Sequence, residues 1–91
     1  MQFRHTYTAG REAVVRHELE RNISDYVKET FPDAHRLYSK KTSSTNKGQV
    51  RQDWRNIINK DGQEIHQIYI EMYKEMTDGD TFYVADVELT K

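Results

Sequence analysis

The four histidines are the first residues to examine for chemistry, because imidazole serves both as an acid-base group and as a metal ligand. They are His5, His17, His35 and His66. His17 begins the run His-Glu-Leu-Glu-Arg, which starts like a zinc-protease helix. Arg21 stands where that site requires its second histidine, and no other pair of histidines has ligand spacing. The sequence therefore predicts no metal site.

Other catalytic groups find equally little support. The chain has no cysteine, no Gly-x-Ser-x-Gly motif and only scattered glycines, so it offers neither a common nucleophile nor a phosphate-binding loop. A metal-free ribonuclease would need a histidine or tyrosine beside a cation, and its candidates are His35, His66, Tyr38 and Arg36. Their spacing does not show that they converge. We expect no catalytic residue and no cofactor.

The basic segment 36–60 is a stronger candidate for function. It carries seven lysines and arginines against one aspartate, a net charge of +6. Cations neutralise phosphates and aromatic rings stack on unpaired bases, so this mixture is typical of single-stranded nucleic-acid binding. The residues that would bind are Arg36, Tyr38, Lys40, Lys41, Lys47, Arg51, Trp54 and Arg55. The pI of about 6.4 argues against a dedicated nucleic-acid binder.

Acidic residues follow the basic segment. Residues 61–91 carry eight carboxylates against two lysines, a net charge of −6, while residues 1–35 sum to −1. A chain that is nearly neutral but sorted in this way can meet a charged partner or a second copy of itself. The alternative is that acidic strands pair with the basic one, so that the sheet neutralises itself.

The first half of the chain predicts a strand followed by one long helix. Residues 2–8 alternate in polarity, as in a short strand. From about residue 10 to residue 31, apolar residues recur every three or four positions, which predicts an amphipathic helix that Thr8 or Gly10 can cap. Pro32 ends it, because a residue before proline avoids the helical conformation.

The second half predicts four strands. Residues 35–42 resemble a polar edge strand, and residues 42–48 contain no apolar residue, which predicts a flexible loop. Turn signals at 59–62 and 77–80 favour antiparallel strands at about 50–59, 64–76 and 81–90. Each signal suits a type I turn followed by a left-handed glycine. Helical spacing of the apolar residues leaves two short helices over 52–76 as the alternative.

These elements give a single α+β domain spanning residues 1–91, in the order β-α-β-β-β-β. In element order the chain is similar to the cystatin or monellin roll, in which one long helix packs on an antiparallel sheet. Cystatins carry a reactive Gln-Val-x-x-Gly hairpin. Here the corresponding run is Gln-Val-Arg-Gln-Asp at residues 49–53, which lacks the glycine. The resemblance therefore implies a fold and not protease inhibition.

The alternation of the last two strands predicts a sheet face that is rich in aromatic residues. If Ile68, Ile70 and Met72 point at the helix, their neighbours point away from it. The outward set would form a protein-binding surface, because tyrosine and arginine are enriched in interface hot spots. We expect its members to be Tyr69, Tyr73, Phe82, Arg51 and Arg55.

The sequence thus favours a non-catalytic protein-binding module. It would be a small intracellular inhibitor or adaptor that occupies the surface of another protein through the aromatic and arginine sheet face and a basic loop. RNA or single-stranded DNA binding through residues 36–55 is the alternative, and homodimerisation through the aromatic face is expected. No signal peptide or membrane span is recognisable, and we therefore expect a cytoplasmic location and no membrane partner.

Overall fold

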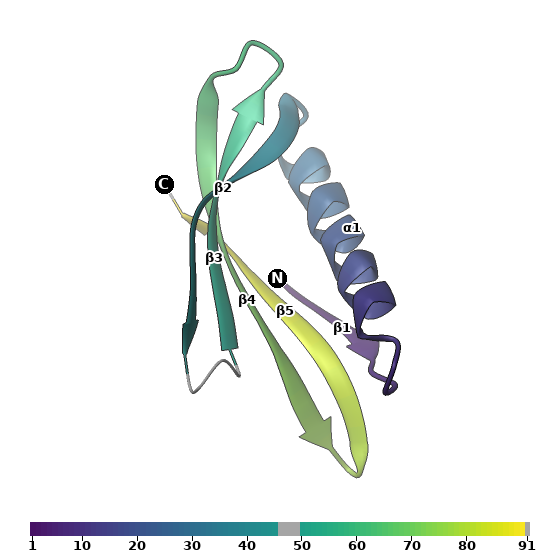
Figure 1. Cartoon of the computed structure of the whole chain (residues 1–91). Coiled ribbons are helices and arrows are strands. Elements are labelled where there is room, and N and C mark those ends of the chain that lie inside the picture. Colours follow the sequence, from purple (N-terminus) through teal and green to yellow (C-terminus); the bar gives the residue numbers. More distant parts are fainter. Residues whose placement is uncertain (46–49, 91) are drawn as a thin grey trace.

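The computed structural model describes residues 1–45 and 50–90 and has one helix packed on a five-stranded antiparallel sheet (Figure 1). The expected α+β class and element order are confirmed. The elements are β1 (Gln2–Thr6), α1 (Glu12–Thr30), β2 (Ala34–Thr45), β3 (Val50–Asn59), β4 (Glu64–Thr77) and β5 (Asp80–Thr90). Residues 52–76, for which the sequence left two short helices as an alternative, form parts of β3 and β4 joined by the turn at 59–62.

The sheet has the strand order β1-β5-β4-β3-β2, which makes β1 and β2 its two edges. The first strand crosses beneath the helix to pair with the last, and Phe3 lies opposite Ala85. The other three pairings join strands that are consecutive in the chain. This order places the basic strand β2 at the edge farthest from the acidic strand β5.

The core lies between α1 and one face of the sheet. Val15, Leu19, Ile23 and Val27 form the buried stripe of the helix, in the spacing that the sequence predicts. The sheet contributes Ile57 of β3 and alternate residues of the next two strands. These are Ile68, Ile70 and Met72 of β4, and Tyr83, Ala85 and Val87 of β5. Figure 1 shows α1 on this side of the sheet and no second layer on the other side of the described chain.

The start of the helix differs from the expectation. Arg11 occupies the N-cap position, and its side chain caps no backbone N–H group. Thr8 and Gly10 instead form the preceding turn, in which the Arg11 N–H donates to the Thr8 carbonyl at 2.9 Å and Gly10 takes a φ of 88°. The expected capping by Thr8 or Gly10 is therefore wrong, because both lie outside the first helical turn.

The two hairpin turns of the second half use different geometries. At the first, Gly62 has a φ of 82° and its N–H donates to the Asn59 carbonyl, as expected for a left-handed glycine after a turn. At the second, Asp78 and Gly79 both have positive φ, 53° and 83°, between the paired residues Thr77 and Asp80. This is the two-residue type I′ hairpin and not the expected type I turn.

Strand β2 is longer than predicted. It continues through Thr45, so the first part of the expected flexible loop belongs to the sheet. Its pairing with β3 has two irregularities, between Ala34 and Arg36 and between Ser39 and Lys41. Residues 46–48 of the expected loop lie outside the described residues.

Candidate functional site: the open face of the sheet

The sheet face opposite α1 is the candidate site, and we call it the open face. Cross-strand register and side-chain alternation assign its residues. They are Arg4 of β1; Arg36, Tyr38 and Lys41 of β2; Gln52, Trp54 and Asn56 of β3; Tyr69, Glu71, Tyr73 and Glu75 of β4; and Phe82, Val84, Asp86 and Glu88 of β5. This set brings together three residues of the predicted protein-binding surface, namely Tyr69, Tyr73 and Phe82.

One row of the open face combines cation, aromatic rings and carboxylate. Register places Lys41, Trp54, Tyr69 and Glu88 side by side on β2, β3, β4 and β5. The Lys41 ammonium lies 4.9 Å from the centre of the Trp54 ring, and the Trp54 and Tyr69 rings are 4.9 Å apart. Gln52 donates a hydrogen bond of 2.9 Å to the Tyr69 hydroxyl. Partial burial, together with the carboxylates of Glu71 and Glu88, raises the pKa of Tyr69.

The Asp86 carboxylate, on β5, accepts two hydrogen bonds on the open face. The Tyr73 hydroxyl donates to Asp86 at 2.7 Å, and Gln2 donates to the other Asp86 oxygen at 2.8 Å. The hydrogen bond to Asp86, aided by partial burial, raises the pKa of Tyr73 to about 12. Glu71 pairs directly across the strands with Asp86, so two carboxylates face each other in register. Like charges in this position repel each other.

Arg4 lies on β1, at the edge of the open face opposite β2. Its guanidinium lies 4.6 Å from the centre of the Phe82 ring and forms an ion pair of 2.9 Å with Glu75. Val84, opposite Arg4 in the register, is fully buried although it lies outside the core cluster. The aromatic residues of the open face are therefore partly buried, and polar and charged side chains of the same face surround them.

Arg51 and Arg55 do not belong to the open face, which corrects the predicted protein-binding set. They pair with Met72 and Ile68, residues of the core side, because the β3 register places odd-numbered residues toward the helix. Arg55 reaches α1, where it donates two hydrogen bonds of 2.7 Å to Glu20, and it donates a third of 2.8 Å to the buried Asp53. Burial lowers the pKa of Arg55, but these two carboxylates outweigh it and raise the pKa overall.

The basic residues of β2 form no ion pair with other described residues. Within residues 1–45 and 50–90, β2 pairs with β3 alone and the β4 partners of Arg51 and Arg55 are apolar, so the described basic residues are not neutralised by acidic residues across the strands. Among the described residues, the side chains of Arg36, Lys40, Lys41 and Arg51 form no ion pair. Arg36 lies 5.6 Å from the centre of the exposed Tyr38 ring. We call Arg36, Lys40 and Lys41 the basic edge; Lys47 lies outside the described residues.

The predicted nucleic-acid set is thus divided between two faces. Arg36, Tyr38, Lys41 and Trp54 lie together on the open face at its β2 end. Lys40 occupies the irregularity that interrupts the strand before Lys41. Arg51 and Arg55 point to the helix side. Only about half of the set can therefore meet one ligand at once.

The histidines do not form a common site in the described part of the chain. His5 lies 2.6 Å from the Asn22 amide oxygen and 3.3 Å from a Glu18 oxygen, whereas His66 packs against Phe31 with ring centres 4.3 Å apart. The other two, at positions 17 and 35, are exposed. Within residues 1–45 and 50–90, no three metal-ligating side chains cluster. No helix in the same ranges is long and apolar enough to span a membrane.

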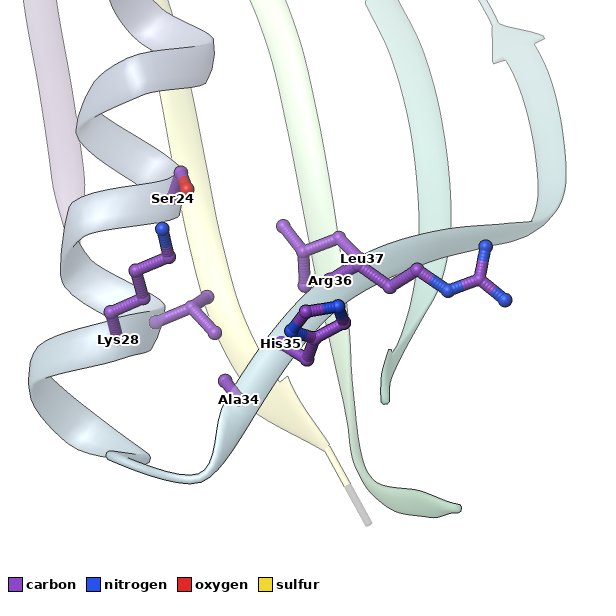
Figure 2. A pocket seen from close by; sticks show the side chains of 7 residues that line it. Ser24, Lys28, Ala34, His35, Arg36 and Leu37 are labelled. Atoms are coloured by element: carbon purple, nitrogen blue, oxygen red, sulfur yellow. The ribbon is translucent and has the colours of Figure 1, made fainter. Parts of the chain in front are cut away.

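Two pockets formed by described residues lie around the start of β2. Figure 2 shows one of about 30 Å³ between the C-terminal half of α1 and the start of β2, where Ser24 and Lys28 face His35 and the Arg36 guanidinium points away from the helix. A wider depression of about 450 Å³ at the end of the sheet is lined by Pro32, Asp33, Ala34, His35, Asn59, Lys60 and Asp61. The first is too small for a typical small-molecule ligand, and the second is lined mainly by polar groups, whereas small-molecule sites are commonly apolar.

Two residues of this arrangement were missed in the sequence. Arg4 lies on the short strand β1, and only the pairing of β1 with β5 brings it to Phe82. Glu20 partners Arg55 across 35 positions of the chain. No local pattern signals either contact, because both depend on which strands neighbour each other.

Comparison of the chain with protein-family models, with curated proteins and with solved structures finds no match. The similarity to the cystatin or monellin roll therefore stays one of element order.

Proposed function

We propose that this protein is a non-catalytic protein-binding module, a small inhibitor or adaptor that occupies a surface of another protein with the open face of its sheet. The observation that carries this proposal is the face itself. Its aromatic residues Trp54, Tyr69, Tyr73 and Phe82 lie on the side of the sheet that α1 leaves uncovered. Aromatic side chains bordered by polar groups are the usual composition of an interface core and its rim.

The charge arrangement of the open face favours a protein partner over a nucleic acid. Lys41 and Arg36 lie at the β2 end of the face, while Glu71, Asp86 and Glu88 lie two and three strands away. A polyanion laid across this face would meet these three carboxylates and, beside them, Glu75. A folded protein can carry the opposite pattern of charge, and this complementarity gives both speed and specificity of association.

The aromatic rings support the same choice. Trp54 already packs against the Tyr69 ring and the Lys41 ammonium, so a base that stacked on it would have to compete with these two neighbours. Of the aromatic residues at the β2 end, Tyr38 is the exposed one, with a relative accessibility of 51%. A protein surface can fill the space around half-covered rings, because its side chains are smaller and more varied than bases.

The proposal leaves the histidines without a catalytic role. His5 is held by Asn22 and Glu18, and His66 packs on Phe31 at the far end of the helix. A general acid or base must lie within hydrogen-bond reach of the proton that it transfers, and a metal-free ribonuclease would also need a cation at the same phosphate. The ribonuclease candidates of the sequence are divided between His66 on the core side and Tyr38 and Arg36 on the open face.

The test is capture of a partner by charge-reversed baits. In the first bait, Glu71→Lys and Glu88→Lys invert the acidic half of the open face, and the fold is retained because Glu88 is exposed and the Glu71–Asp86 repulsion is relieved. In the control bait, Asp25→Lys and Glu29→Lys make the same change of charge on the exposed side of α1. We expect a partner held by the wild type and the control and lost by the open-face bait. A partner that all three baits hold equally would contradict the proposal.

Nucleic-acid binding is the second candidate, and the unpaired cations Arg36 and Lys41 favour it. Labelled single-stranded RNA and DNA, titrated at about 50 mM and about 200 mM salt, separate it from the first. Our proposal predicts no binding at the lower salt. Tight binding that collapses at the higher salt and is lost with Lys40→Glu and Lys41→Glu would put this candidate first.

A further inference from the structure

We infer that the outer edge of β2 accepts an acidic, extended segment of the partner protein as a sixth strand of the sheet. This inference rests on the proposed function, because it names the chemistry of one part of the partner. The sheet ends at β2, and Figure 1 shows its second half running along the side of the sheet away from α1, with no described element beside it. Its outer N–H and C=O groups are therefore available for main-chain pairing.

The regular part of the strand sets where the added segment lies. The register with β3 is uninterrupted from Arg36 to Ser39 and again from Lys41 to Thr45. The irregularity at Lys40 separates these two runs. A segment paired with Lys41–Ser44 would continue past Lys40 toward Arg36, so that all three cations of the basic edge lie within its reach.

The charge of the basic edge selects an acidic segment. Arg36 and Lys41 point to the same face of the strand, and their partners on β3, Ile58 and Trp54, are four positions apart. Residues four apart on the added segment share one face and would therefore meet both cations. Opposite charges at directly facing positions stabilise a pair of strands, and like charges destabilise it. Edge lysines normally prevent strand pairing, but they exclude apolar and basic strands and admit an acidic one.

Other occupants of the edge fit less well. A second copy joined through the same strand would bring the basic edge against itself. The acidic strand β5 of a second copy is already covered, because β1 pairs with it from Phe82 to Asp86 and Met1 bonds to Val87. A nucleic acid offers no row of amides to continue the ladder. The remaining occupant is an acidic segment of another protein.

The inference is tested with a synthetic probe, a fluorescein-labelled peptide of alternating threonine and glutamate. Its binding is followed by anisotropy, and backbone amide exchange of the protein is followed by NMR. We expect the probe to bind at about 50 mM salt and to slow exchange of amides between Lys41 and Ser44. A variant with Arg36→Glu and Lys41→Glu should bind roughly tenfold more weakly or worse. The control, Arg21→Glu with Lys28→Glu on the exposed side of α1, should bind like the wild type.

Two further probes separate pairing from simple charge attraction. The same peptide with every backbone nitrogen methylated keeps every carboxylate but has no N–H group to donate on either edge, and we expect it not to bind. Equal binding of both peptides, no binding of the unmodified peptide, or stronger binding of single-stranded RNA would each overturn the inference. If the peptide fails while the bait with Glu71→Lys and Glu88→Lys still loses its captured partner, the proposed function stands and the edge is not part of the site.

Discussion

At the scale of single residues, Arg55 is the side chain whose role the structure changes most. From the sequence it is one more cation of a basic segment, but the register places it inside, bonded to Glu20 and Asp53. Its side chain has an accessibility of 13% and that of Asp53 one of 7%. Removing one member of such a pair leaves a buried charge without a partner.

We expect Arg55→Met to lower the free energy of unfolding by about 3 kcal/mol, the lower end for buried pairs, because Glu20 is partly exposed and screened by solvent. Arg51→Met is the matched control, since Arg51 lies on the same strand and face but is exposed and forms no ion pair within the described chain. It should change stability by less than about 0.5 kcal/mol. Urea unfolding measures both, and equal effects would show that the Arg55 network contributes nothing.

Tyr73 predicts a dependence of stability on alkaline pH. The hydrogen bond to Asp86 raises the pKa of Tyr73 from 10.0 to about 12, so the folded state holds this proton more tightly than the unfolded state does. The resulting stabilisation is fully present below about pH 10 and is lost as the pH rises toward about 12. The difference in unfolding free energy between the wild type and Tyr73→Phe should therefore shrink over this interval. A difference that stays constant to the end of it would refute the link.

At the scale of elements, α1 derives its stability from the stripe that it buries. Leu19 and Ile23 are fully buried against the sheet, as the spacing of the sequence predicts. Leu19→Ala should cost about 2–5 kcal/mol through lost burial and the cavity left behind. Val14→Ala on the exposed side of the same helix should change stability by less than about 0.5 kcal/mol. Similar losses in the two variants, measured by thermal or urea unfolding, would contradict the assigned helix face.

The uncapped start of α1 gives a prediction of opposite sign. Arg11 at the N-cap leaves backbone N–H groups unsatisfied and places a positive charge at the positive end of the helix dipole. Arg11→Asp supplies an acceptor and reverses that charge, so we expect the melting temperature to rise, with a gain of roughly 0.5–2 kcal/mol. Arg21→Asp in the helix interior is the control and should give no gain. A gain in both variants would point to net charge and not to capping.

At the scale of the whole molecule, the helix and strands could be predicted from the sequence, but the order and register of the strands in the sheet could not. Periodicity identifies the helix and strands, and alternation correctly turns Tyr69, Tyr73 and Phe82 away from α1. The face of β3 depends on its register with β4, so a shift of one residue moves Arg51 and Arg55 to the opposite side. The strand order likewise sets β2 apart from the acidic strands. Such long-range pairing leaves no signature in a short window of sequence.

The single tryptophan of the chain gives the most direct test of the central claim, because Trp54 lies in the middle of the open face. The measurement is acrylamide quenching of Trp54 fluorescence in the captured complex, with a tryptophan-free form of the partner. We predict that complex formation reduces quenching of Trp54, since the partner covers the ring, and that the wild type and the Asp25→Lys, Glu29→Lys control behave alike. Unchanged quenching in a fully formed complex would place the partner elsewhere and contradict the assignment of the open face as the binding site.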